Sequence, residues 1–494
     1  MATTCVLALD QGTTGSAAAV VDASGRVLAK TKRDFRQHFP RPGWVEHDPE
    51  DIWRSQLAAI RQALSEAKVG GDRIAAIGVT NQRETTLLWS RATGKPAHNA
   101  IVWQDRRTAD ICEKLKNARK EQLVRRKTGL VLDPYFSATK IRWMLDEVDG
   151  LERGAKNGEL AFGTVDSFLL WRLTGGKVHA TDPSNASRTL LMDLRTLSWD
   201  DELLALFNVP RALLPEIRPS VGVFGTTRRV PGLPDGIPIA GLAGDQQAAL
   251  FGQACFSPGE AKCTFGTGSF LLLNTGAKPV ESLSGCLTTV AWQRDGKTTY
   301  ALEGAAFVCG AAVQWLRDGL GLFVSSEDIE ALARSVPDCA GVQFVPALTG
   351  LGAPYWNPNA RGVITGLTRG TTRAHLARAT LEGMALQNVD LLLAMQKDLR
   401  RAITSVKVDG GAAANDLLMQ MQADFLGVPC VRPAIIETTS AGAAFMAGLG
   451  VGLWKTESDI RRIWKAQRAF LPRLRARGER AERLRLWREA VTRA

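Results

Sequence analysis

The sequence predicts an α/β protein made of two related domains. Strands alternate with helices along most of the chain, which is the α/β pattern. A strand–loop–strand motif with a Gly/Thr-rich loop also occurs twice, about half a chain apart, at 10–16 and at 266–269. The chain has 494 residues, enough for two large domains. We place the boundary near 252–258, which gives domains of residues 1–253 and 254–494.

In the first half, apolar runs and turn residues predict strands, and one polar–apolar segment predicts a helix. Asp48 is a suitable cap for this helix, and Pro49 fits its first turn. The first Gly/Thr loop joins two strands and not a strand and a helix, which separates it from Walker and Rossmann loops. The expected strands cover 5–9, 17–21, 26–30 and 74–79, and the expected helix covers 48–67.

The second half repeats this pattern. Strands are expected at 261–265 and 270–274 on either side of the second loop, and another at 405–408. A Gly-Gly turn follows that last strand, and a helix should begin near Asn415. Residues 438–454 are uncharged but rich in Gly and Ala, and too short for a typical membrane span. We expect a buried helix there that packs through small residues.

Composition narrows the possible functions. Hydrophobic residues make up 45% of the chain and charged residues 23%, which excludes extensive disorder. The net charge is +12, and +9 of it lies in residues 461–494. A nucleic-acid-binding protein would usually be basic over a whole face, so we expect no nucleic-acid partner. The eight cysteines show no metal-binding spacing and predict reduced core thiols in a cytoplasmic protein.

The basic C-terminal segment allows two interpretations. Its residues 481–494 intersperse Leu484, Leu486, Trp487 and Val491 among arginines. A helix that docks by its apolar side, with arginines reaching to solvent, fits this pattern. Contact with an anionic membrane or a nucleic acid is the alternative, without stable membrane insertion.

The two Gly/Thr loops suggest phosphate binding. Backbone N–H groups in tight turns bind anions, glycine permits close approach, and Thr hydroxyls add donors. Each loop alone could be an ordinary hairpin turn. Asp10 ends the first strand, where it could hold Mg²⁺ through water, and Asp245 follows an apolar run. Either carboxylate could instead be a cap or a turn residue.

Nine motifs resemble the FGGY carbohydrate kinases. Seven of them resemble the glycerol kinases in particular, and those at 135–143 and 362–367 resemble signatures of the wider family. The similarity runs from residue 6 to 454 without large gaps. The motifs lie at 10–14, 81–85, 103–107, 135–143, 244–249, 300–304, 350–356, 362–367 and 408–412.

The resemblance implies an actin-like fold, with two ribonuclease-H-like domains around a deep cleft for ATP and substrate. It also implies ATP-dependent phosphorylation of glycerol to sn-glycerol 3-phosphate, as in glycerol uptake and catabolism. Asp245 would be the general base, and Asp10 the acid near the metal, with Mg²⁺ held by Asp10 and Asp245 through water. By motif position, the glycerol site would contain Arg83, Glu84, Trp103, Tyr135, Asp245, Gln246 and Phe270. The ATP site would contain Thr13, Thr14, Gly15, Gly266, Thr267, Gly310, Gln314, Gly411, Ala412 and Asn415.

The first loop departs from the family pattern. Familiar glycerol kinases end this loop in Ser-Ser-Arg, and the Arg approaches the nucleotide phosphates. Here the stretch is Gly15-Ser16-Ala17. A lost charge-assisted contact costs about 1.5–3 kcal/mol. We therefore expect weaker ATP binding or slower transfer, unless Arg188 or another cation reaches the phosphates.

A second departure concerns regulation. Some bacterial members bind fructose 1,6-bisphosphate through a Gly-rich loop with a basic residue. The aligned stretch, 230–238, carries Asp235, and Gly236 stands where the Arg would be. We expect no inhibition by this sugar. A loop histidine whose phosphorylation activates other members is also missing between 224 and 238.

Alternatives to glycerol phosphorylation are another FGGY sugar or polyol kinase and a catalytically weak ATP-binding regulator of the same fold. Trp103 and Phe270 argue against a larger substrate because they would narrow the pocket. Retention of Asp10, Asp245, Arg83 and Glu84 argues against a regulator. The resemblance suggests a homodimer or homotetramer.

Overall fold

The computed structural model describes residues 4–473 and 477–494. The first half of the chain forms a six-stranded mixed sheet in the order β13-β14-β5-β1-β2-β3. β1, β2 and β3 are antiparallel neighbours, whereas β5 and β14 run parallel to β1. The strands are β1 (Cys5–Gln11), β2 (Gly15–Asp22), β3 (Val27–Asp34), β5 (Ile74–Asn81), β13 (Val221–Thr226) and β14 (Pro238–Gly244).

The second half forms a seven-stranded sheet in the order β17-β18-β16-β15-β21-β22-β23. Its central strands repeat the first sheet: β15, β16 and β18 are antiparallel neighbours, and β21 and β22 run parallel to β15. The strands are β15 (Ala261–Phe265), β16 (Ser269–Gly276), β17 (Leu287–Arg294), β18 (Lys297–Ala306), β21 (Val406–Asp409), β22 (Cys430–Pro433) and β23 (Ala466–Phe470). This repeated topology confirms the predicted pair of related α/β units.

Helices cover both faces of each sheet. In the first sheet, alternate residues of β1 face opposite cores. Leu7 and Leu9 face α1, while Val6 and Ala8 face α14. The helices are α1 (Pro49–Ala67), α2 (Ala109–Asn117), α3 (Glu121–Thr128), α4 (Ser137–Glu147), α5 (Leu151–Lys156), α6 (Val165–Leu173), α7 (Pro183–Ala186), α8 (Asp201–Phe207), α9 (Asp245–Gly252), α10 (Gly310–Asp318), α11 (Asp328–Arg334), α12 (Arg373–Leu399), α13 (Asp416–Leu426), α14 (Thr438–Gly450), α15 (Glu457–Ile463) and α16 (Arg477–Val491).

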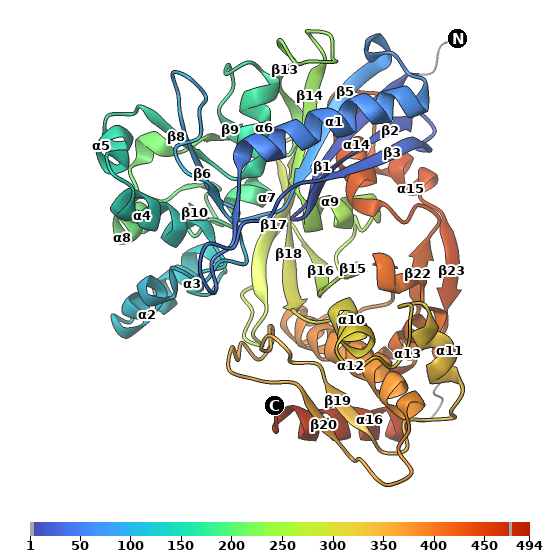
Figure 1. The fold of residues 1–494 in the computed structure, drawn as a ribbon. Coiled ribbons are helices and arrows are strands. Elements are labelled where there is room, and N and C mark those ends of the chain that lie inside the picture. The colour runs from blue at the N-terminus through green and yellow to red at the C-terminus, as the bar shows by residue number, and fades with distance from the viewer. Residues whose placement is uncertain (1–3, 474–476) are drawn as a thin grey trace.

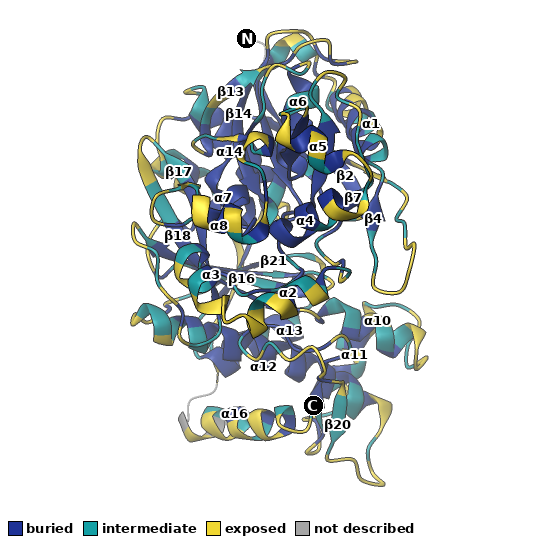
Figure 2. Ribbon diagram, turned by 90° about the vertical axis from the view of Figure 1, so that its left-hand side faces the viewer, coloured by how far each residue is buried: buried dark blue, intermediate teal, exposed yellow. Residues whose placement is uncertain are grey.

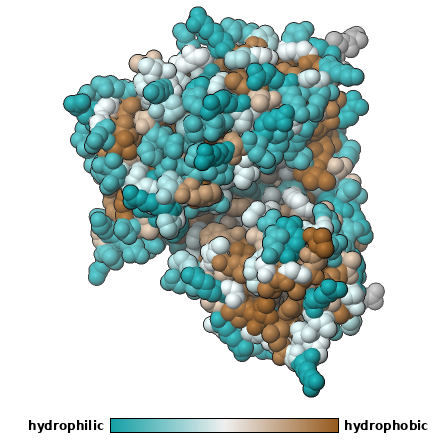
Figure 3. All heavy atoms as spheres, viewed as in Figure 1, coloured by the Kyte–Doolittle hydropathy of each residue, from teal (hydrophilic) through white to brown (hydrophobic). Residues whose placement is uncertain are grey.

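The two sheets lie in an upper and a lower body (Figure 1), and the surface is hollowed between these bodies (Figure 3). Shorter elements surround the sheets. They are the strand pairs β4 (Glu46–His47) with β7 (Ala100–Ile101), β6 (Leu87–Ser90) with β8 (Leu160–Gly163), β9 (Ala180–Thr181) with β12 (Glu216–Ile217), β10 (Met192–Asp193) with β11 (Ser198–Trp199) and β19 (Gln343–Val345) with β20 (Val363–Thr365), and the 3₁₀ helices Gly71–Arg73, Arg211–Leu213 and Gly411–Ala414.

The helix pair α9–α14 joins the two halves. α14 belongs to the second half of the sequence but packs on β14, β5 and β1 of the first sheet, and α9 contacts both sheets. Their axes approach closely because glycines face each other. A Cβ built on Gly442 would lie 1.8 Å from the Ala248 carbonyl oxygen, and one on Gly252 would lie 2.0 Å from the Thr438 oxygen. The predicted small-residue helix is therefore confirmed, although it ends at Gly450 and not at 454, and Gly452 turns the chain with φ +77°.

Local predictions in the first half are confirmed. The Asp48 side chain caps α1 by accepting the Glu50 N–H at 2.8 Å. β3 is longer than expected and continues to Asp34.

The predicted core thiols are also found, since all eight cysteines are buried and free. No helix of the described residues is long and apolar enough to cross a membrane.

The C-terminal helix docks by its apolar side. Leu484, Trp487 and Ala490 are buried, and the Trp487 indole N–H donates to Asp390 at 2.6 Å. Most of the other residues of α16 are exposed at the edge of the molecule (Figure 2). This arrangement supports the docked-helix interpretation of the basic segment. Residues 474–476 of that segment lie outside the described residues.

The α9–α14 contact gives a stability prediction. We expect Gly442→Ala to lower the free energy of unfolding by about 3 kcal/mol or more, because the added methyl overlaps backbone that cannot move alone. Gly478→Ala is the matched control, since Gly478 is an exposed helical glycine with open space around it. The control should be neutral or stabilising by about 0.5–1 kcal/mol. Thermal unfolding midpoints test this, and an unchanged midpoint for Gly442→Ala would contradict the tight crossing.

Candidate active site

The first Gly/Thr loop connects β1 and β2. It is closed by a hydrogen bond from the Gly12 N–H to the Gly15 carbonyl at 2.9 Å. Thr13 is half-buried and Thr14 is exposed, so both hydroxyls lie where a ligand could reach them. Asp10 is the last residue but one of β1, just before the loop, and its Oδ2 accepts a hydrogen bond from the Ser440 hydroxyl at 3.1 Å. Ser440 belongs to α14, so this bond joins the loop to the helix pair.

The second Gly/Thr loop connects β15 and β16. The Gly310 N–H at the start of α10 donates to the Gly266 carbonyl at 2.9 Å. A Cβ on Gly310 would lie only 2.8 Å from that oxygen, which explains the glycine. Gly410 has φ +86° and packs equally tightly against Phe265. Thr267 and Gln314 are exposed beside this loop.

The turn after β21 completes the predicted nucleotide side. Gly411 and Ala412 begin the 3₁₀ helix that contacts β15. The Asn415 Oδ1 accepts the Leu418 N–H at 2.8 Å and so caps α13. The structure therefore gathers the predicted nucleotide residues of the second half around one hairpin, and Asn415 has a structural task there as well.

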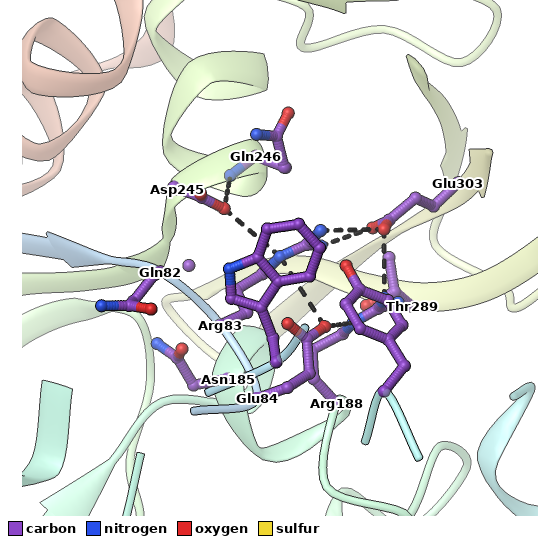
Figure 4. Close-up of polar contacts among 12 residues, drawn as sticks. Gln82, Arg83, Glu84, Asn185, Arg188, Asp245, Gln246, Thr289 and Glu303 are labelled. Carbon is purple, nitrogen blue, oxygen red and sulfur yellow. Dashed lines mark hydrogen bonds and ion pairs between the residues drawn. The ribbon is translucent and has the colours of Figure 1, made fainter. Parts of the chain in front are cut away.

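A buried network of four charges lies beside Asp245 (Figure 4). Arg83 donates to both oxygens of Glu303, with Nη2 to Oε1 at 2.8 Å. Arg188 donates to Glu84 at 2.7 Å and to Glu303 at 3.1 Å. All four residues are at most 3% exposed. Two cations and two anions balance one another, which makes the burial of so many charges tolerable.

The pKa shifts of the two glutamates go in opposite directions. Burial disfavours the charged form of Glu303, but Arg188 and Arg83 together lower its pKa to about 2. Burial raises the pKa of Glu84 despite the opposing charges of Arg83 and Arg188. Glu303 is thus firmly ionised and holds both guanidinium groups. Glu84 keeps one carboxylate oxygen away from Arg188 and available as an acceptor.

Asp245 lies at the edge of this network, at the first residue of α9. Its Oδ1 accepts the Gln246 N–H at 2.7 Å and lies 3.3 Å from the Arg83 Nε. Its side chain is 30% exposed, in contrast to the buried quartet. Burial raises its pKa, Arg83 and Lys262 oppose this, and the charge of Asp10 adds to it. An accessible carboxylate of raised pKa, anchored at one oxygen, is suited to accept a proton.

Asp10 and Asp245 fit a magnesium site that is completed by a nucleotide. Burial raises the pKa of both carboxyls, and a divalent cation would relieve this cost. No cluster of three or more acidic, His or Cys ligands occurs among the residues that the structure describes. Mg²⁺ commonly takes one or two carboxylates, water and phosphate oxygens, which matches this sparse donor set.

Three aromatic rings form a wall beside the network. Trp103 lies between Tyr135 and Phe270, with ring centroids 5.6 and 6.4 Å away. Phe270 comes from the second half of the chain, so both halves build this wall. The Trp103 indole N–H donates to the Thr13 hydroxyl at 2.9 Å. The wall is therefore bonded directly to the first Gly/Thr loop.

The structure places one residue differently from expectation. Arg188, considered as a phosphate-binding cation, is buried with Glu84 and Glu303 instead. Gln246 lies next to Asp245, and its side chain accepts a hydrogen bond from buried Lys262, which also donates to Thr264 at 2.8 Å. Lys262 and Glu303 received no role from the sequence. Glu303 lies in one of the recognised motifs, but only the structure shows that it binds Arg83 and Arg188.

Comparisons with known proteins identify the family of this chain. Residues 5–252 match the N-terminal domain of the FGGY family of carbohydrate kinases, and residues 261–451 match its C-terminal domain. A glycerol kinase of Bdellovibrio bacteriovorus is 60% identical over 99% of both chains, and one of Myxococcus xanthus is 58% identical over 99% of both chains. The crystal structure of Plasmodium falciparum glycerol kinase with ADP superposes with a TM-score of 0.93 at 35% identity, covering 99% of this chain and 98% of the other. The chain therefore belongs to the FGGY family of carbohydrate kinases, on its glycerol kinase branch.

Proposed function

We propose that this protein phosphorylates glycerol with ATP to give sn-glycerol 3-phosphate. One observation supports this most strongly. Fixed polar groups of Arg83, Glu84 and Asp245 lie together below an aromatic wall, and that wall is bonded to a Gly/Thr loop. Whole-length similarity to glycerol kinases supports the same conclusion.

A three-carbon triol suits these surroundings. Arg83 can only donate hydrogen bonds and the ionised Glu84 can only accept them, so together they distinguish the donor and acceptor sides of a hydroxyl. Tyr135 adds a phenol, and Gln246 lies beside Asp245. Trp103 and Phe270 pack against the carbon backbone and limit the size of the substrate. A site of fixed donors and acceptors rejects analogues that lack a hydroxyl.

Asp245 would accept the proton of the hydroxyl that attacks the γ-phosphorus. Its Oδ1 is held by the Gln246 N–H and faces Arg83, so the other oxygen is left for the substrate. Base assistance is worth about 10²–10⁴-fold. Positioning and electrostatic stabilisation supply most of the rest in phosphoryl transfer.

The two Gly/Thr loops would bind ATP from opposite sides of the cleft. Thr13, Thr14 and Gly15 serve the first side, and Gly266, Thr267, Gly310, Gln314, Gly411, Ala412 and Asn415 serve the second. When bound, Mg²⁺ would neutralise charge on the phosphates, held by Asp10 and Asp245 through water. Closure of the two bodies would exclude water as a competing acceptor.

Three further properties stay predictions. We propose a cytoplasmic enzyme, which fits eight buried free thiols, and a homodimer or homotetramer, which light scattering would test. We also propose no inhibition by fructose 1,6-bisphosphate. In the loop concerned, the Asp235 carboxylate faces outward and accepts the Arg229 N–H at 2.6 Å. Clear inhibition by the millimolar sugar would contradict this.

The proposed function is tested by ADP release with Mg²⁺·ATP and a panel of polyols and ketoses. We expect turnover with glycerol and little with pentuloses, because the aromatic wall narrows the site. Turnover only with a larger sugar would favour another FGGY kinase. ATP binding without turnover of any acceptor would favour a catalytically weak ATP-binding regulator of the same fold.

Asp245→Asn should lower kcat for glycerol by about 10²–10⁴-fold, because the amide cannot take the proton. Glycerol affinity should change by only a few-fold, since Asn keeps the shape and one acceptor. Asp295→Asn is the matched control, because Asp295 lies exposed in the β17–β18 turn. Steady-state kinetics and glycerol titrations measure both effects. A kcat that survives in Asp245→Asn would remove Asp245 as the base.

Glu303→Gln should weaken glycerol binding by about tenfold or more. Without this carboxylate, Arg83 and Arg188 lose their shared partner, and Arg83 would turn further toward Asp245. An uncompensated buried charge should also lower the unfolding free energy by about 3–5 kcal/mol. Glu482→Gln is the control, because Glu482 forms an exposed ion pair with Arg485. If stability falls but the glycerol dissociation constant holds, Glu303 serves the fold alone.

A further inference from the structure

Three side chains form a row across the first sheet, next to the first Gly/Thr loop. Asp10 on β1 pairs with Ala17 on β2, and Ala17 pairs with Lys32 on β3. Directly paired residues of neighbouring strands project from the same face. Lys32 therefore shares a face with Asp10, one strand further out than Ala17.

Two small residues make room for Lys32. A Cβ on Gly15 would lie 2.8 Å from the Lys32 Cε and 2.6 Å from the Asp34 Oδ1. Ala17, between Lys32 and Asp10, has only a methyl group. Both positions are those where this chain departs from the Ser-Ser-Arg pattern of familiar glycerol kinases. Ala17 removes the arginine of the family pattern, and Gly15 and Ala17 together leave the space that the Lys32 side chain occupies.

The Lys32 ammonium lies at the loop itself. Its Nζ is 3.4 Å from the Thr14 hydroxyl and 2.8 Å from the Asp34 carboxylate. Both partners of this ion pair are more than half exposed, so the pair is weak and the ammonium can turn to another anion. Lys30, two residues earlier on the same face, is instead bound to Glu437.

We propose that Lys32 binds the nucleotide phosphates at the first loop and takes the role of the arginine that Ala17 replaces. This inference rests on the proposed use of ATP. Ala17 alone predicts weaker ATP binding. With Lys32 on the neighbouring strand in place of the arginine, we expect the affinity for the nucleotide phosphates to be kept. Lysine is a mobile point charge, so it needs no bidentate geometry at its new position.

The test measures binding of ADP and of a non-hydrolysable ATP analogue by calorimetry, with the full chain and Mg²⁺. Lys32→Gln should weaken both by about tenfold, and this difference should shrink at high salt because the contact is exposed. Arg33→Gln is the matched control. Arg33 is an exposed cation on the same strand, directed to the opposite face, and its loss should change affinity less than about twofold.

The double variant Ala17→Arg with Lys32→Gln provides the rescue. It should recover most of the lost affinity, because the cation returns to the family position. Unchanged affinity in Lys32→Gln, while wild type turns over glycerol, would overturn this inference and leave the proposed function intact. An equal loss in Arg33→Gln would also overturn it, since general surface charge would then explain the effect. Weaker nucleotide binding in Lys32→Gln alone, without glycerol turnover in wild type, would support Lys32 and refute the function.

Discussion

The balanced burial of Arg83, Arg188, Glu84 and Glu303 is the constraint on which the rest of the site depends. Arg83 and Glu84 follow a strand of the first sheet, whereas Glu303 lies on β18 of the second. The quartet therefore exists only when both sheets are in place. Because no member can lose its partner without leaving a bare charge in the interior, the guanidinium of Arg83 is fixed beside Asp245. The position of the proposed substrate-binding residue Arg83 thus follows from charge balance at the contact of the two halves.

The polar contacts continue from this quartet toward the cleft. Asp245 lies at its border, Gln246 is held by Lys262, and Lys262 leads through Thr264 to Asp409. Asp409 also accepts from Thr438 at the start of α14. On the other side, Asp10 accepts from Ser440, two residues further along the same helix. One helix, α14, thus orients a carboxylate from each sheet, Asp10 on β1 and Asp409 on β21.

Much of the fold could be predicted from the sequence. Apolar runs and turn residues located the strands of both hairpins, and Asp48 and Asn415 located two helix starts. The site residues came from motif resemblance, and the structure gathers them. What the sequence could not supply were pairings between distant residues. Glu303 and Arg83 are 220 residues apart, and Lys32 gains its meaning only from strand register. Arg188 looked like a free cation because its carboxylate partners are remote in the chain.

The placement of α14 has a consequence for how the chain folds during synthesis. The first sheet leaves the ribosome early, but the helix that covers its Val6 and Ala8 face is made almost last. Until residue 450 has emerged, an apolar face of that sheet remains uncovered, and such a face invites association with other chains. The core of the first sheet is therefore completed by a helix from the second half of the chain. Nascent chains of this protein should rely on chaperone protection until the C-terminal helices arrive.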